Sequence, residues 1–128
     1  MRTNYRIGYE LEQRAKKTFE KAGWIVQRSA GSKGAFDLVA FNDNAKFLVQ
    51  CKKTHSEELR VSKLTELMLM SKRVNAKPLL VYGFFKSPVY VTEIEGDKEV
   101  LSTTGVHKEL EKFLAVDQLQ DQADYIAR

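Results

Sequence analysis

Residues 36–53, with the sequence FDLVAFNDNAKFLVQCKK, hold the pattern that decides the fold. Two apolar runs, residues 36–41 and 46–52, flank a polar NDN segment at 42–44. Short runs rich in Val and Phe are typical of strands, and clusters of Asn and Asp are typical of turns. A polar connection this short between two such runs predicts a β-hairpin.

The hairpin sorts its polar residues, because side chains alternate between the two faces of a strand. Gln50 and Lys52 project to one face, and Cys51 projects to the other. We expect Asp37 to project away from the apolar residues on either side of it. In the right register the hairpin then places Asp37 beside Gln50 and Lys52.

Apolar periodicity predicts the elements on both sides of the hairpin. Residues 4–22 carry one apolar helical stripe, and Gly23 is a typical helix stop. Residues 29–35, SAGSKGA, form a Gly/Ser loop. The predicted elements are a helix over 4–22, strands over 24–28, 36–41 and 46–52, a helix over 58–74, strands over 78–85 and 89–94, and a helix over 105–127 that begins near residue 106. Their order is α-β-β-β-α-β-β-α, an α/β arrangement.

The composition predicts one soluble domain over residues 1–128, with residues 105–128 as a C-terminal helical tail. Hydrophobic residues make up 43% and charged residues 30% of the chain, a balance typical of globular proteins. No run approaches the roughly 18–20 apolar residues of a membrane span, and the amino terminus lacks the run of a signal peptide. The single cysteine, Cys51, is expected to be a buried small apolar residue. These features favour a cytoplasmic protein, with nucleoid association and a viral origin both left open.

Positive charge is concentrated in the first half of the chain. Residues 1–63 hold 13 Lys and Arg against 7 Asp and Glu, whereas residues 64–128 hold 8 against 10. A basic region suits a polyanionic partner such as DNA. On charge alone, an ordinary solvated surface is an equally good interpretation.

The polar residues of the hairpin form a set suited to metal-assisted hydrolysis of phosphodiesters. Asp37 is a hard oxygen ligand for Mg²⁺, or for Mn²⁺ in its place. The side-chain amide of Gln50 and the backbone carbonyl of Cys51 offer two neutral oxygens. Lys52 is suited to orient or deprotonate the attacking water, or to stabilise charge on the phosphate.

The first helix is expected to add another carboxylate to this set. Two candidates exist, Glu10 and Glu12. Around the helix Glu12 falls about 80° from the centre of the apolar stripe and Glu10 about 120°. Glu12 therefore lies nearer the buried edge, from which a side chain reaches the sheet, and is preferred.

These motifs resemble the PD-(D/E)xK nuclease superfamily, and within it the archaeal-type Holliday junction resolvases. The matching pieces are G-x-x-x-E at 8–12, GWIVQRSAGS at 23–32, DLVA at 37–40 and FLVQCKK at 47–53. The resemblance implies a restriction-endonuclease-like fold, in which a mixed central β-sheet is flanked by helices. It also implies a homodimer that hydrolyses DNA with two metal ions.

The resemblance further implies that Glu12, Asp37, Gln50 and Lys52 hold the catalytic positions. The first three of these and the carbonyl of Cys51 are the expected metal ligands. A serine of the Arg/Ser-rich loop is functional in the resolvase pattern, and Ser32 occupies its place. The expected DNA-binding residues are Arg6, Arg28, Ser29, Ser32, Lys33 and Lys53, since Gly-rich backbone, hydroxyls and cations bind phosphate oxygens.

One residue departs from the resolvase pattern, which has a carboxylate where this chain has Gln50. A neutral amide attracts Mg²⁺ less than an anion does, so weaker metal binding is expected. Gln-x-Lys resembles the Mrr-like branch of the superfamily, so a restriction-type or general nuclease stays open as an alternative. A non-catalytic DNA-binding relative is the second alternative.

Neither histidine is expected to bind metal. His55 and His107 lack Cys or carboxylate partners at the spacing of zinc sites. His55 follows Lys52 and Lys53 and is placed to contact DNA. The sequence therefore predicts a homodimeric, Mg²⁺-dependent endonuclease acting on four-way DNA junctions, with no membrane segment and no small-molecule cofactor.

Overall fold

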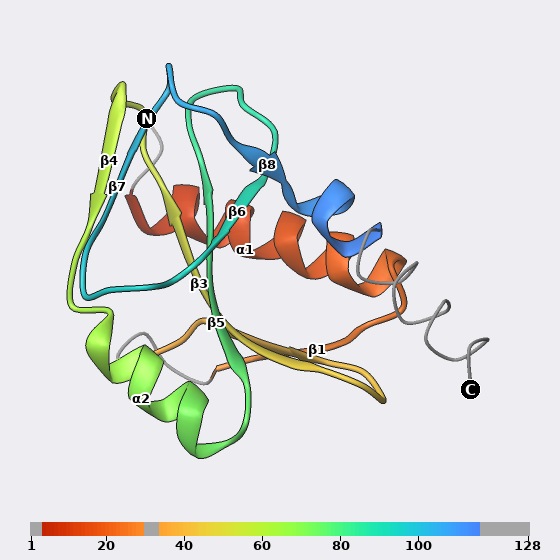
Figure 1. The fold of residues 1–128 in the computed structure, drawn as a ribbon. Coiled ribbons are helices and arrows are strands. Elements are labelled where there is room, and N and C mark those ends of the chain that lie inside the picture. The colour runs from red at the N-terminus through yellow and green to blue at the C-terminus, as the bar shows by residue number, and fades with distance from the viewer. Residues whose placement is uncertain (1–3, 30–33, 116–128) are drawn as a thin grey trace.

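The computed structural model describes residues 4–29 and 34–115, and the side chains of the first helix from residue 8 onward. Six strands form a mixed sheet in the order β1-β2-β3-β5-β6-β8, and β4 and β7 form a separate antiparallel pair. The elements are α1 (Asn4–Lys21), β1 (Ile25–Arg28), β2 (Leu38–Phe41), β3 (Lys46–Lys53), β4 (Glu58–Val61), α2 (Thr65–Arg73), β5 (Lys77–Gly83), β6 (Tyr90–Glu93), β7 (Glu99–Ser102) and β8 (Lys108–Glu109). Helix α1 and helix α2 lie on opposite faces of the sheet (Figure 1).

Helix α1 forms as predicted, because its apolar residues recur once per turn. Leu11, Ala15 and Phe19 are all buried, at spacings of four residues. Gly23 follows the helix with a φ of 93°, a left-handed conformation that glycine adopts without steric cost. The helix therefore ends at Lys21, and its buried stripe rests on the sheet.

The β2–β3 hairpin is confirmed, and the side chain of Asn42 closes its turn. The two strands are antiparallel, with Leu38 opposite Val49. Asn42 Oδ1 accepts hydrogen bonds from the backbone N–H groups of Asn44 and Ala45, at 2.9 and 2.8 Å. This is the local hydrogen bonding for which Asn favours turns.

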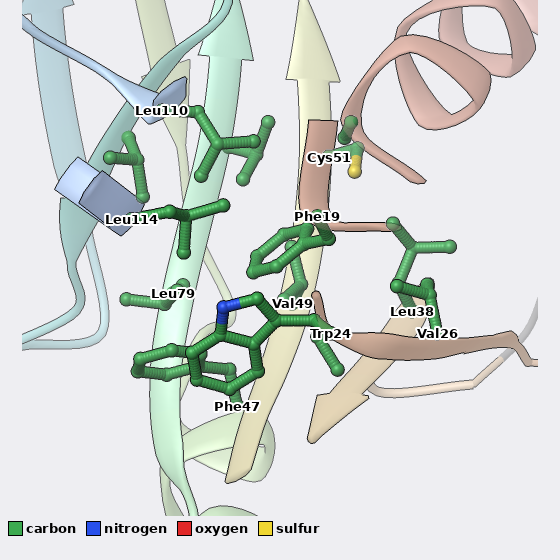
Figure 2. Close-up of a cluster of buried hydrophobic side chains, with 14 of the residues drawn as sticks. Phe19, Trp24, Val26, Leu38, Phe47, Val49, Cys51, Leu79, Leu110 and Leu114 are labelled. Carbon is green, nitrogen blue, oxygen red and sulfur yellow. The ribbon is translucent and has the colours of Figure 1, made fainter. Parts of the chain in front are cut away.

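Strand β3 contributes residues to both cores. It pairs with β2 on one side and, in parallel, with β5 on the other. Its odd-numbered residues from Phe47 to Cys51 pack under α1, in the cluster that Figure 2 shows around Trp24. Leu48 packs on the opposite face with the α2 residues. Burial on both faces explains why β3 is nearly continuous in apolar residues.

The helix predicted over 58–74 is wrong in its first part. Residues 58–61 form β4, where Leu59 and Val61 are buried and their neighbours exposed, a period of two. Strand β4 pairs with β7, which the sequence pattern did not predict. Lys63 then has a φ of 61°, which no helix accommodates, so α2 begins only at Thr65.

A long-range contact fixes the start of α2. The Oδ1 atom of Asp97 accepts hydrogen bonds from the backbone N–H of Thr65 at 3.1 Å and from its hydroxyl at 2.7 Å. A carboxylate at a helix amino terminus satisfies N–H groups that have no partner inside the helix. Here that carboxylate comes from 32 residues further along the chain, so local sequence did not reveal it.

The helix predicted to begin near residue 106 starts later. Residues 108–109 form β8, which extends the sheet by pairing with β6. Residues 110–115 are helical, and Leu110 and Leu114 are buried in the α1-side core. The remainder of the predicted tail helix lies outside the described residues. Within them, no helix combines the length and apolarity needed to cross a bilayer.

Replacing Phe19 by Ala tests the α1-side core. Phe19 is fully buried and makes an edge contact with Trp24, with ring centroids 6.0 Å apart. Truncating a buried Phe leaves a cavity, so we expect Phe19→Ala to lower the free energy of unfolding by about 3–5 kcal/mol in urea titrations. Val100→Ala, at a residue 58% exposed, is the matched control and should change it by less than about 0.5 kcal/mol. Equal stability of the two variants would contradict this packing.

Candidate active site

The carboxylate of Asp37 binds the backbone of β3 where the hairpin ends. Its Oδ2 atom accepts a hydrogen bond of 2.7 Å from the N–H of Cys51. That N–H belongs to the peptide bond that joins Gln50 to Cys51. The Asp37 carboxylate therefore lies beside the β3 backbone between Gln50 and Cys51.

A β-bulge sets this orientation of Asp37. The N–H of Asp37 donates to the carbonyl of Val49 at 2.8 Å, and Val49 is also the register partner of Leu38. Two successive residues thus lie opposite one residue of β3, as in a bulge. The expectation of simple alternation is wrong here, because Phe36 packs in the α2-side core and Leu38 in the α1-side core.

The carbonyl of Cys51 points to the same side of β3 as its N–H group. In an extended strand, the N–H and C=O groups of one residue point to the same neighbouring strand. The N–H of Cys51 points to Asp37, so the carbonyl of Cys51 faces that edge as well.

The side chain of Cys51 is poorly suited to act as a nucleophile. The thiol is buried beneath α1. Burial raises the pKa of Cys51 well above its ordinary value, and the negative charges of Asp37 and Glu12 raise it further, against a smaller opposing effect of Lys52. A protonated thiol is a poor nucleophile and a poor metal ligand.

Glu12 of α1 interacts electrostatically with Asp37. Burial raises the pKa of Glu12 above its ordinary value, the charge of Asp37 raises it further, and Arg28 lowers it. The two carboxylates are thus close enough to repel each other. Electrostatic repulsion between carboxylates at a half-buried site is relieved by a cation or by a proton.

Arg28 of β1 contacts both Glu12 and Tyr9, an arrangement that the sequence did not reveal. Its Nε atom lies 3.8 Å from the carboxylate of Glu12, and its guanidinium carbon lies 4.9 Å from the ring centre of Tyr9. Tyr9 and Glu12 are three residues apart and so lie on the same helix face. The i, i+3 spacing of Tyr9 and Glu12 could be read from the sequence. No local pattern indicated that both residues would contact Arg28.

Gln50 and Lys52 share a face of β3, as predicted. They alternate with Cys51, which points to the α1-side core. Gln50 is half-buried and Lys52 is exposed at the end of the strand. Gln50 and Lys52 therefore lie on the face of β3 that points away from the α1-side core.

The Gly/Ser loop begins and ends at the site. The N–H of Ser29 donates to the carbonyl of Asp37 at 2.9 Å. Arg28 is exposed, and Lys53 is half-buried at the end of β3. Three predicted DNA-binding positions, Ser32, Lys33 and the side chain of Arg6, lie outside the described residues.

The described residues contain no group of three His, Cys, Asp or Glu side chains arranged to hold a metal ion. The predicted ligand set differs from such a group, because only Glu12 and Asp37 in it are carboxylates. Its other members are the amide of Gln50 and the Cys51 carbonyl. Oxygen ligands of this kind are the ones that Mg²⁺ and Mn²⁺ prefer.

Solved structures share this fold. The Holliday junction resolvase Hjc of Archaeoglobus fulgidus superposes with a TM-score of 0.70 at 16% identity, covering 84% of this chain and 95% of that one. The bacterial homing endonuclease I-Ssp6803I superposes with a TM-score of 0.60 at 18% identity, covering 96% and 99%. Both likenesses confirm the restriction-endonuclease-like fold expected from the sequence.

Sequence comparison adds the family. The crossover junction endodeoxyribonuclease Hjc of Methanocaldococcus jannaschii is 32% identical over 122 residues, which cover 91% of this chain and 87% of the relative. The family model for archaeal Holliday junction resolvase (hjc) matches residues 3–123. The match spans all the elements that build the site, and the chain therefore belongs to the archaeal Holliday junction resolvase family.

Proposed function

We propose that this protein is an endodeoxyribonuclease that resolves four-way DNA junctions by metal-dependent hydrolysis of two phosphodiester bonds. The supporting observation is the contact of the Asp37 carboxylate with the Gln50–Cys51 peptide, together with the electrostatic coupling of Glu12 to Asp37, in a chain of the resolvase family. A homodimer would carry two such sites, and its two-fold axis would match that of a junction cut symmetrically.

The proposed metal ligands are Glu12, Asp37, the amide oxygen of Gln50 and the carbonyl of Cys51. A bound Mg²⁺, or Mn²⁺ in its place, polarises the phosphate and lowers the pKa of a bound water. The two carboxylates fit a cation because their mutual repulsion is relieved by one. The hydrogen bond from Cys51 holds Asp37 in place before any cation arrives.

Lys52 is the proposed residue for the reacting phosphate. It is exposed at the end of β3, one residue beyond Cys51. An ammonium group there can stabilise the negative charge that grows on the phosphate oxygens, or orient the attacking water. Arg28 and the Gly/Ser loop would hold the DNA backbone against this end of the strand.

Asp37→Asn, assayed with a four-way junction and a linear duplex of the same sequence, tests the proposed function. Asn keeps an oxygen for the Cys51 N–H but loses the charge. We expect wild type to cut the junction in preference to the duplex in Mg²⁺, and the variant to cut on the order of 100-fold or more slowly. Junction binding should survive.

Asp43→Asn is the matched control, because Asp43 is an exposed residue of the β2–β3 turn. It should cut at the wild-type rate. Equal cutting of duplex and junction by wild type would instead support the restriction-type alternative. Binding without any cutting in Mg²⁺ or Mn²⁺ would support a non-catalytic DNA-binding protein.

Gln50→Glu tests the role of the neutral ligand. A third carboxylate adds charge to the proposed metal site, and cation affinity rises with the number of charged ligands. The Mg²⁺ concentration for half-maximal cleavage should fall by roughly tenfold, and calorimetric Mg²⁺ binding should tighten in parallel. A folded variant that binds DNA but no longer cuts it would show that the amide has a specific function.

Arg28→Gln tests the electrostatics of Glu12 through the pH dependence of cleavage. Metal binding needs the ionised carboxylate, so the single-turnover rate should fall as pH drops through the pKa of Glu12, which burial and Asp37 raise above its ordinary value. Arg28 lowers that pKa, so its removal should move the acid limb to higher pH. Arg28→Lys, which keeps the charge, should leave the limb near that of wild type. Identical profiles for Arg28→Gln and wild type would rule out this coupling.

A further inference from the structure

The ends of β3 and β5 leave the sheet side by side, beyond the proposed active site. The strands are parallel, and Lys53 lies opposite Gly83. The N–H of Thr54 then donates to the carbonyl of Gly83 at 3.2 Å, which keeps the two chains together as they leave the sheet. Both strands run toward the upper part of the view in Figure 1. The segments that follow therefore share one surface next to Lys52.

An aromatic–basic patch, consisting of His55, Phe85 and Lys86, forms on this surface. The ring centroids of His55 and Phe85 lie 5.0 Å apart. The Nζ atom of Lys86 lies 5.3 Å from the centroid of Phe85. Despite these neighbours Phe85 is 59% exposed, so much of its ring remains open to a further contact.

The turn after β5 holds Phe85 out in solvent. Its neighbour Phe84 is 4% exposed and packs in the α2-side core. The hydroxyl of Ser87 accepts a hydrogen bond of 2.8 Å from the N–H of Phe84, and the N–H of Ser87 donates to the Phe84 carbonyl at 3.1 Å. Lys86 has a φ of 58°, a conformation that non-glycine residues rarely adopt. The bonded turn and the buried neighbour fix the position of the exposed ring.

We propose that the aromatic–basic patch stacks a base at the branch point of the DNA junction, with Phe85 as the platform and Lys86 on a phosphate. Aromatic rings stack bases of any sequence, and cations beside them bind the backbone. His55 lies three residues beyond Lys52, a span of at most about 10 Å, or about three base steps. The patch is therefore within reach of DNA held at the proposed active site.

This inference rests on the proposed function and adds a basis for substrate choice. In a linear duplex both faces of each interior base are covered by neighbouring bases. At a branch point stacking is interrupted between arms, so a base face is available to Phe85. Stacking on Phe85 would thus favour the junction over the duplex without any contact to base edges.

Binding of a four-way junction and of a duplex of the same sequence, measured by fluorescence anisotropy, tests the patch. All proteins carry Asp37→Asn to prevent cutting. Phe85→Ala should weaken junction binding by about tenfold and duplex binding by less than about twofold. Phe85→Trp should restore junction binding, and Val100→Ala, another exposed apolar truncation, should change neither.

A direct readout separates stacking from a merely structural effect. Junctions carry 2-aminopurine at positions beside the branch point, and stacking quenches its fluorescence. Quenching should appear at one of these positions with Phe85 or Phe85→Trp and disappear with Phe85→Ala. Lys86→Asn, which keeps a residue tolerant of the left-handed backbone, should lower the salt slope of junction binding by about one ion.

Two results would overturn the proposal. One is a loss of affinity in Phe85→Ala that is equal for junction and duplex. The other is 2-aminopurine quenching that is unchanged by that variant. If wild-type protein cuts no junction, the proposed function fails, and this inference with it. If wild type cuts and Phe85→Ala cuts and binds like it, the inference alone fails.

Discussion

The hydrogen bond between the Asp37 carboxylate and the Cys51 N–H is the contact on which the rest of the site depends. It forms where the β2–β3 ladder gives way to a bulge, so a side-chain oxygen takes the place of a backbone acceptor. Hydrogen bonds to a charged group contribute about 1.5–3 kcal/mol, more than neutral ones. One contact thus gives the Cys51 N–H at the strand edge a partner and sets the direction of the Asp37 carboxylate.

The positive charge of Arg28 offsets only part of the negative charge of Glu12 and Asp37. Glu12 is only 18% exposed in its side chain, and both burial and Asp37 disfavour its ionised form. Arg28 offsets part of this cost from 3.8 Å, while its guanidinium group rests on Tyr9. Such an arrangement costs stability in the absence of a cation, as functional sites often do.

Strand β3 connects the two cores, the site and the surface beyond it. Its burial on both faces makes it rigid, and a rigid strand holds side chains more precisely than a loop does. Its end, paired with that of β5, carries Lys52 and leads to the exposed ring of Phe85. A single strand therefore relates the proposed hydrolytic centre to the surface proposed to select the substrate.

Local patterns in the sequence were sufficient for α1, for the hairpin and for the fold class, because periodic burial and the Asn42 turn are encoded within a few residues. They were insufficient for β4, since a strand of four residues becomes distinct from a helix only when β7 pairs with it. They placed Glu12 and Asp37 in one candidate site. They did not reveal the β-bulge at Asp37 or the contacts of Arg28 with Glu12 and Tyr9. Those depend on which distant backbone and side-chain groups meet, and only tertiary packing decides that.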